Sequence, residues 1–166
     1  MLIYHQAYDA YHCLFRMIAI VDHVHEIEVD KARILDFYLM FPAMASKIRM
    51  PYNYAYVKKI AKSYENVYHD PLSPASTFKD LQEIQTSAIK CLTATGLVEK
   101  ELYKKGVLKR TKLEIPNGLV TSLMAFINEK QDINEFILHT LSDFHLLGKE
   151  GLKDRTGLME YRYDFN

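Results

Sequence analysis

The fold is decided by residues 76–115, STFKDLQEIQTSAIKCLTATGLVEKELYKKGVLKRTKLEI. The first half predicts a helix capped by Ser76 or Thr77, because apolar residues recur there at helical spacing: Leu81, Ile84, Ala88, Ile89 and Leu92. Gly96 can end this helix in a left-handed conformation. Residues 97–103 and 107–115 then predict two short strands around a glycine turn. This order is typical of a winged helix-turn-helix domain, with the long helix as its third helix and the hairpin as its wing.

Residues upstream supply the other two helices of such a core. Asp9 is a suitable N-cap for a helix over residues 9–25, in which apolar residues recur three and four positions apart. A second helix covers residues 30–42, with Asp30 as its cap. Pro42 should end it, since proline disfavours a helical conformation in the residue before it.

The remaining segments are also mostly helical. An amphipathic segment covers residues 54–64, and after residue 118 two apolar stripes predict helices over 119–127 and 133–141. Residues 158–166 alternate by twos and predict an edge strand. We therefore predict a mainly α protein with a small β-hairpin, in one domain over 1–166. Its parts are an N-terminal extended arm (1–8), a winged helix-turn-helix core (9–115), and additional C-terminal helices with a tail (116–166).

The composition is that of an ordinary globular protein. The chain has 166 residues, and its 21 basic residues balance 21 acidic ones. Zero net charge gives no general reason for nucleic-acid binding, so any such binding needs a local basic patch. The two cysteines, Cys13 and Cys91, are too few for a disulfide framework and suit a reducing cytoplasm. With no apolar run of about 18 residues and no signal-peptide pattern, we expect a cytoplasmic protein that does not enter the membrane.

The sequence contains no complete catalytic or cofactor-binding motif. The six glycines form no phosphate-binding loop, and no GxSxG motif occurs. Two short clusters hold possible metal ligands: His5, Asp9 and His12, and His23, His25 and Glu26. Neither cluster has the spacing of a zinc site. We predict that the chain is not an enzyme and binds neither a cofactor nor a metal.

The predicted wing is locally basic, with Lys104, Lys105, Lys109, Arg110 and Lys112. Such residues can contact DNA phosphates or an acidic partner protein, or they can be a solvated edge that discourages strand pairing. The third helix argues against reading of DNA bases, because its polar positions carry two acids beside two lysines.

Three motifs stand out in the first hundred residues. They are YHQAYDAYHCLFRMIAI at 4–20, EVDKARILDFYLMFP at 28–42 and GLVE at 96–99. Together they resemble the middle component of ABC-three-component systems, bacterial anti-phage and anti-plasmid systems that include Lamassu. The resemblance covers roughly residues 4–125, and its motif residues include Tyr11, His12, Phe15, Arg16, Asp30, Arg33 and Asp36.

The resemblance implies a subunit with no activity of its own. Such a subunit would be an adaptor that bridges an SMC-like ATPase, which senses foreign DNA, and an effector subunit, often a nuclease. Contact with DNA would then come through the complex.

Two hypotheses for the function remain open. In the first, the chain is this adaptor subunit. In the second, it is a free winged-helix DNA-binding transcription regulator that forms a dimer. The zero net charge and the twelve tyrosines favour the adaptor, since tyrosine is enriched at protein interfaces.

Overall fold

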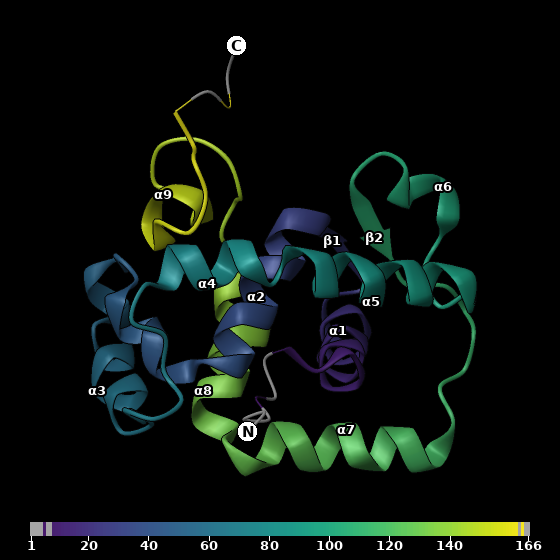
Figure 1. The fold of residues 1–166 in the computed structure, drawn as a ribbon, viewed down its shortest axis with the longest axis horizontal. Coiled ribbons are helices and arrows are strands. Elements are labelled where there is room, and N and C mark those ends of the chain that lie inside the picture. Colours follow the sequence, from purple (N-terminus) through teal and green to yellow (C-terminus); the bar gives the residue numbers. More distant parts are fainter. Residues whose placement is uncertain (1–4, 6–7, 163, 165–166) are drawn as a thin grey trace.

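The computed structural model describes residues 5, 8–162 and 164 and is mainly helical (Figure 1). Its centre is formed by α1 (Ala10–Val24), α2 (Val29–Met40) and α5 (Gln82–Ala94), with α1 packed against both others. The predicted cap of α1 is confirmed, since the Asp9 carboxylate accepts a hydrogen bond from the His12 backbone N–H at 3.1 Å. The three helices contribute large side chains to the core, among them Met17, Ile20, Ile34, Leu35, Ile89 and Leu92.

The long third helix is interrupted once. It consists of α4 (Pro74–Asp80) and α5, and they meet at the fully buried Leu81. The predicted start at Ser76 or Thr77 is wrong, because Pro74 supplies the first helical turn, where a missing N–H costs nothing. The predicted end is confirmed. Gly96 has φ 81°, and its N–H donates to the Thr93 carbonyl at 3.1 Å.

A small antiparallel β element joins distant parts of the chain. Strand β1 (Glu26–Glu28) pairs with β2 (Val107–Lys109) and places Ile27 opposite Leu108. Residues 97–99 lie along the other edge of β2, where Val98 bridges Arg110 and the Glu99 N–H donates to the Lys109 carbonyl at 2.9 Å. The predicted hairpin is therefore present at residues 97–99 and 107–110, away from its loop.

The strand predicted at residues 102–103 is wrong. Residues Lys100–Tyr103 form the short helix α6 inside the loop of the hairpin, and the Tyr103 N–H donates to the Glu99 carbonyl at 3.1 Å. The sequence KELY is rich in helix-forming residues. Its hydrogen bonds close locally, so the pairing of residues 97–99 with the end of β2 does not continue into residues 100–103.

The other elements surround this centre. After α2 come η2 (Pro42–Lys47), η3 (Tyr52–Tyr54) and α3 (Tyr56–Lys62). After the sheet come α7 (Asn117–Glu129), α8 (Gln131–Glu135), the wider turn η4 (Phe136–Thr140), η5 (Leu141–Asp143) and α9 (Leu152–Thr156). Figure 1 shows α7 along one side of the molecule, and α3 and α6 at its opposite ends. No helix in the described residues combines the length and the apolar character needed to cross a membrane.

The edge strand predicted for the tail is wrong in the part that the structure describes. Residues 158–162 and 164 contain no strand, and the Asp164 N–H donates to the Tyr161 carbonyl at 3.2 Å. The Glu160 carboxylate accepts the N–H groups of Tyr161 and Arg162, so these backbone groups bond locally and need no neighbouring strand. Most of the predicted arm, residues 1–4 and 6–7, lies outside the described residues.

Candidate interaction sites

Two residues of the family-like motifs form a buried ion pair. Arg16 lies on α1 and Asp36 on α2, and the Arg16 Nε donates to the Asp36 Oδ1 at 2.7 Å. The side chains are only 4% and 0% exposed. Burial opposes the charge on Arg16, but the Asp36 carboxylate outweighs that effect, so the pKa of Arg16 is raised. Arg16 therefore keeps its charge, and its bond to Asp36 joins two central helices.

Gln85 of α5 extends this pair into a network. Its Nε2 donates to the Asp36 Oδ2 at 2.9 Å and to the Arg33 carbonyl at 3.2 Å, and its Oε1 accepts from the Arg33 Nε at 3.0 Å. Arg33 also donates to Asp30 at 3.2 Å, and its guanidinium lies 4.7 Å from the centre of the Phe78 ring. Four motif residues thus act with Gln85 to tie α1, α2, α4 and α5 together.

Sequence reasoning missed Gln85 as part of this network, although a signal was present. Gln85 stands four positions after Leu81 and four before Ile89, on the apolar stripe of the predicted helix. A polar side chain on a buried face needs hydrogen-bond partners. The two motif arginines and Asp36 were the candidates to supply them.

The neighbouring thiol is chemically inert. The Cys13 Sγ lies 3.9 Å from the Asp36 Oδ2. Burial, with a further contribution from the Asp36 carboxylate, raises the pKa of Cys13 to about 12. Because the thiolate is the reactive form of cysteine, the network offers no nucleophile at neutral pH. Its arrangement suits a rigid scaffold.

The other three motif residues do not join the network. Tyr11 is 73% exposed on the first turn of α1, and the His12 Nδ1 lies 3.2 Å from the Asp9 carboxylate. Phe15 meets Phe126 of α7 edge to face, with ring centres 5.5 Å apart. Phe15 therefore links α1 to α7, whereas Tyr11 lies exposed at the start of α1.

Carboxylates in the structure pair with three of the five basic residues of the predicted wing. Lys109 lies 3.7 Å from the Glu26 carboxylate, Arg110 lies 3.3 Å from Asp22, and Lys104 lies 3.1 Å from Glu101. Arg110 also donates to the carbonyls of Thr111 and Leu113, which fixes it to the protein. Two cations of the wing, Lys105 and Lys112, are exposed and form no ion pair in the described part of the chain.

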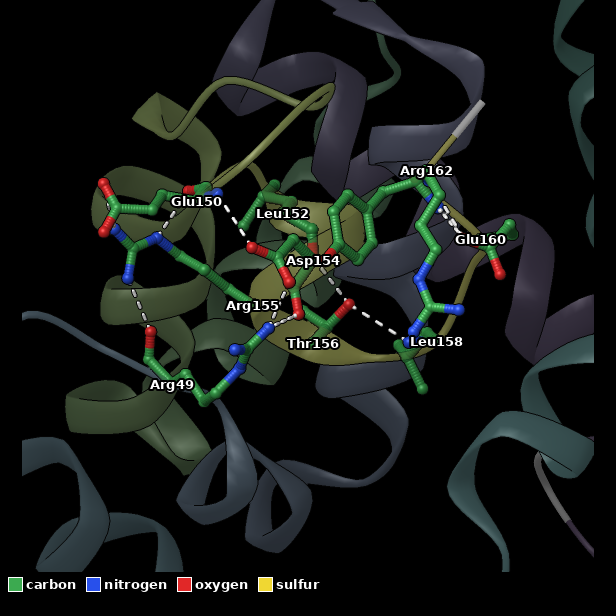
Figure 2. Close-up of polar contacts among 10 residues, drawn as sticks. Arg49, Glu150, Leu152, Asp154, Arg155, Thr156, Leu158, Glu160 and Arg162 are labelled. Carbon is green, nitrogen blue, oxygen red and sulfur yellow. Dashed lines mark hydrogen bonds and ion pairs between the residues drawn. The ribbon is translucent and has the colours of Figure 1, made fainter. Parts of the chain in front are cut away.

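A second polar cluster, which the sequence did not indicate, holds α9 against the segment after η2 (Figure 2). Arg49 pairs with Asp154, and the Arg155 guanidinium donates to the Arg49 carbonyl at 2.6 Å. The Asp154 carboxylate also accepts the Glu150 N–H at 2.9 Å. That backbone hydrogen bond, together with the Arg49 guanidinium, lowers the pKa of Asp154. This cluster fastens the C-terminal region to the middle of the chain.

The two histidine clusters do not form a metal site in the structure. Among the described residues, no group of three or more His, Cys, Asp or Glu side chains is arranged to hold a metal ion. His5 stacks on His69 with ring centres 4.8 Å apart, and His23 Nδ1 lies 2.8 Å from the Ala19 carbonyl one turn earlier.

Comparison with known proteins agrees with the motif pattern. The family model described as ABC-three component (ABC-3C) system Middle Component 5 matches residues 2–164. Neither a curated protein nor a solved structure matches the chain. The family match spans both the buried network and the C-terminal cluster, and the chain therefore belongs to the family of middle components of ABC-three component systems.

Proposed function

We propose that the chain is a non-catalytic adaptor of a defence system, which bridges an SMC-like ATPase that senses DNA and an effector subunit such as a nuclease. The family supports the coarser part of this proposal, since a middle component implies other components of the same system. The observation that carries the bridging role is the exposure of Tyr11, a motif residue that the fold leaves uncovered.

We propose that Tyr11 belongs to an interface with another subunit, formed by exposed and half-buried side chains of two helices that Phe15 and Phe126 connect. We define the α1–α7 surface as Tyr11 and Phe15 of α1 with Val120, Met124 and Phe126 of α7. Only Leu123 and Ile127 of α7 are buried, and Met124 is 59% exposed. Exposed aromatic side chains and methionine are enriched at protein interfaces. The proposed occupant is another component of the same three-component system.

Co-purification tests this surface. Tyr11→Asp and Met124→Asp each place a charge on the α1–α7 surface, and we expect each to reduce recovery of a partner subunit when all components are expressed together. Leu72→Asp is the matched control, because Leu72 is fully exposed outside this surface. If the wild-type chain recovers only copies of itself, the adaptor proposal is wrong.

We also propose that the core is a variant of the winged helix. Three features support this proposal. The elements follow one another in the order α1, β1, α2, α5, residues 97–99 and β2. In addition, β2 pairs with a segment on each side, and α6 lies in the loop of the hairpin. Residues 41–73 would then be an enlarged connection between the second and third helices of the core.

The wing is proposed as a second contact, either with DNA held by the complex or with an acidic partner. Lys105 and Lys112 are the cations to test, since changing Arg110 would also break its bond to Asp22 within the fold. If the wing contacts DNA, the double variant Lys105→Glu, Lys112→Glu should lower the DNA affinity of the assembled complex. If the wing contacts a partner protein, the same variant should reduce recovery of that partner. If neither the DNA affinity nor the recovery of a partner changes, the wing is a solvated edge.

A further inference from the structure

The charges of this neutral chain are unevenly placed. Residues 37–64 contain no Asp or Glu, although they carry five basic residues: Lys47, Arg49, Lys58, Lys59 and Lys62. Arg49 is paired with Asp154. The four lysines are exposed, and none pairs with a carboxylate in the part of the chain that the structure describes. Among the described residues, this segment therefore combines four exposed lysines without an ion pair and no acidic residue.

Helix α3 presents three of these lysines on one side. Val57 and Ala61 are buried and fix which side of the helix faces the core. At 100° per residue, Lys58, Lys59 and Lys62 share an arc of about 100° outside this buried side, with Lys62 one turn beyond Lys58. The lysines therefore form a short row directed to solvent.

Two tyrosines continue this row. Tyr56 begins α3 and is 55% exposed, and Tyr52 lies one turn earlier in η3 and is 95% exposed. The backbone between them is helical, with Ala55 in the right-handed helical region, so successive turns place Tyr52, Tyr56 and Lys59 along one side, next to the stripe of Lys58 and Lys62. We call Tyr52, Tyr56, Lys58, Lys59 and Lys62 the α3 surface.

The composition of the α3 surface favours nucleic acid over protein. Lysine is depleted at protein interfaces, whereas lysine contacts with phosphates supply most of non-specific nucleic-acid affinity. Exposed aromatic rings beside a basic row are the elements that bind single strands, because the rings stack on unpaired bases. In contrast to the wing, this surface carries no carboxylate, and α3 and α6 lie at opposite ends of the molecule (Figure 1).

We propose that the α3 surface binds single-stranded nucleic acid, with the lysines on the phosphates and the tyrosines stacked on bases. This inference goes beyond the adaptor function. It assigns the middle component a direct nucleic-acid contact that needs no partner subunit.

Fluorescence anisotropy of the purified full-length chain with a labelled oligothymidylate of about 20 nucleotides tests the proposal. Affinity should fall steeply with salt. The triple variant Lys58→Gln, Lys59→Gln, Lys62→Gln should flatten the slope of log affinity against log salt by about 2, at roughly 0.7 for each phosphate contact with a single strand. Tyr52→Ala and Tyr56→Ala should each weaken binding by roughly 5-fold or more, whereas the two Tyr→Phe variants should bind like the wild type.

The matched control is Lys79→Gln, Lys90→Gln, Lys149→Gln, which removes the same charge from exposed positions elsewhere. The slope of log affinity against log salt for this control should stay near that of the wild type. The proposal is wrong if both triple variants weaken binding equally, if duplex DNA binds as tightly as the single strand, or if the wild type does not bind at low salt. It is also wrong if the α3 variant keeps its oligonucleotide affinity but loses a co-purifying subunit. The assay uses the isolated chain, so its outcome does not depend on the adaptor proposal.

Discussion

Arg16 and Asp36, twenty positions apart, meet through two hydrogen bonds in the core, from Nε at 2.7 Å and from Nη2 at 3.4 Å. A third hydrogen bond runs from the Arg16 Nη1 to the Met40 sulfur at 3.4 Å. Removing two charges from water is costly, and the cost is offset only when the geometry is good and the remaining polar atoms are bonded. Here Gln85 supplies a further bond to the carboxylate.

The first prediction concerns the loss of one charge from this pair. Asp36→Ala leaves the Arg16 guanidinium buried without its partner, and we expect a loss of about 3–5 kcal/mol in the free energy of unfolding. Chemical denaturation followed by circular dichroism measures it. Lys104→Gln is the control, because it breaks an exposed pair with Glu101 and should cost less than about 1 kcal/mol. A similarly small loss for Asp36→Ala would contradict the arrangement.

The second prediction concerns Gln85. Gln85→Leu keeps the size and removes the bonds to Arg33 and Asp36, which leaves buried polar groups unsatisfied. We expect a loss of about 1–3 kcal/mol in the free energy of unfolding, measured by denaturant titration. Gln82→Leu is the matched control on the same helix, because Gln82 is exposed and its replacement should change stability by about 0.5 kcal/mol at most. Equal effects of the two substitutions would show that Gln85 is not a link in the core.

The helical part of the fold was predictable because its signals are local. Asp9 caps α1, α2 ends before Pro42, and Gly96 ends α5 in the left-handed region, and each of these features depends on a few neighbouring residues. The buried network was not predicted because it depends on three-dimensional proximity. The motif residues Arg16 and Asp36 were noted, but their spacing alone does not show that they meet.

The errors in the β regions have a related cause. The alternation at residues 158–166 and the apolar pair at residues 102–103 are both compatible with strands, yet a strand also needs a partner with free N–H and carbonyl groups. Residues 102–103 would have to continue the strand of residues 97–99, but they form helix α6 and close their hydrogen bonds locally. No local pattern indicated that Glu26–Glu28 would pair with a segment about eighty residues away.

The third prediction concerns the core of α5. Leu92 is buried among the central helices, so Leu92→Ala should lower the free energy of unfolding by about 2–5 kcal/mol through lost burial and a residual cavity. Leu72→Ala makes the same chemical change at a fully exposed position and should have almost no effect. A loss below about 0.5 kcal/mol at Leu92 would mean that α5 does not pack as described.

The fourth prediction compares the two thiols. Cys91 is exposed, whereas Cys13 is buried and its pKa is raised to about 12. At pH 8 a chromogenic disulfide reagent should therefore label one thiol of the folded chain quickly and the second only after denaturation. Cys91→Ser should remove the fast phase, and Cys13→Ser should leave it unchanged. Fast labelling of two thiols in the folded protein would contradict the buried position of Cys13.

The fifth prediction concerns the pH dependence of the C-terminal attachment. The Glu150 N–H and the Arg49 guanidinium lower the pKa of Asp154 below the value of about 3.9 that an unfolded Asp has. A lowered pKa in the folded state stabilises the fold above the unfolded pKa, and this contribution disappears as the pH falls through the folded pKa. Asp154→Asn should therefore be less stable than the wild type at pH 7, and the difference should shrink between pH 4 and pH 2.

Thermal unfolding followed across this pH range measures the difference between the two proteins. Asp143→Asn is the matched control, because Asp143 is exposed and forms no ion pair in the part of the chain that the structure describes. Its stability should stay parallel to that of the wild type at every pH. The Arg49→Gln variant should reproduce part of the effect, since it removes the cation but leaves the hydrogen bond from Glu150. If the Asp154→Asn difference stays constant down to pH 2, the carboxylate does not hold α9 against the segment after η2.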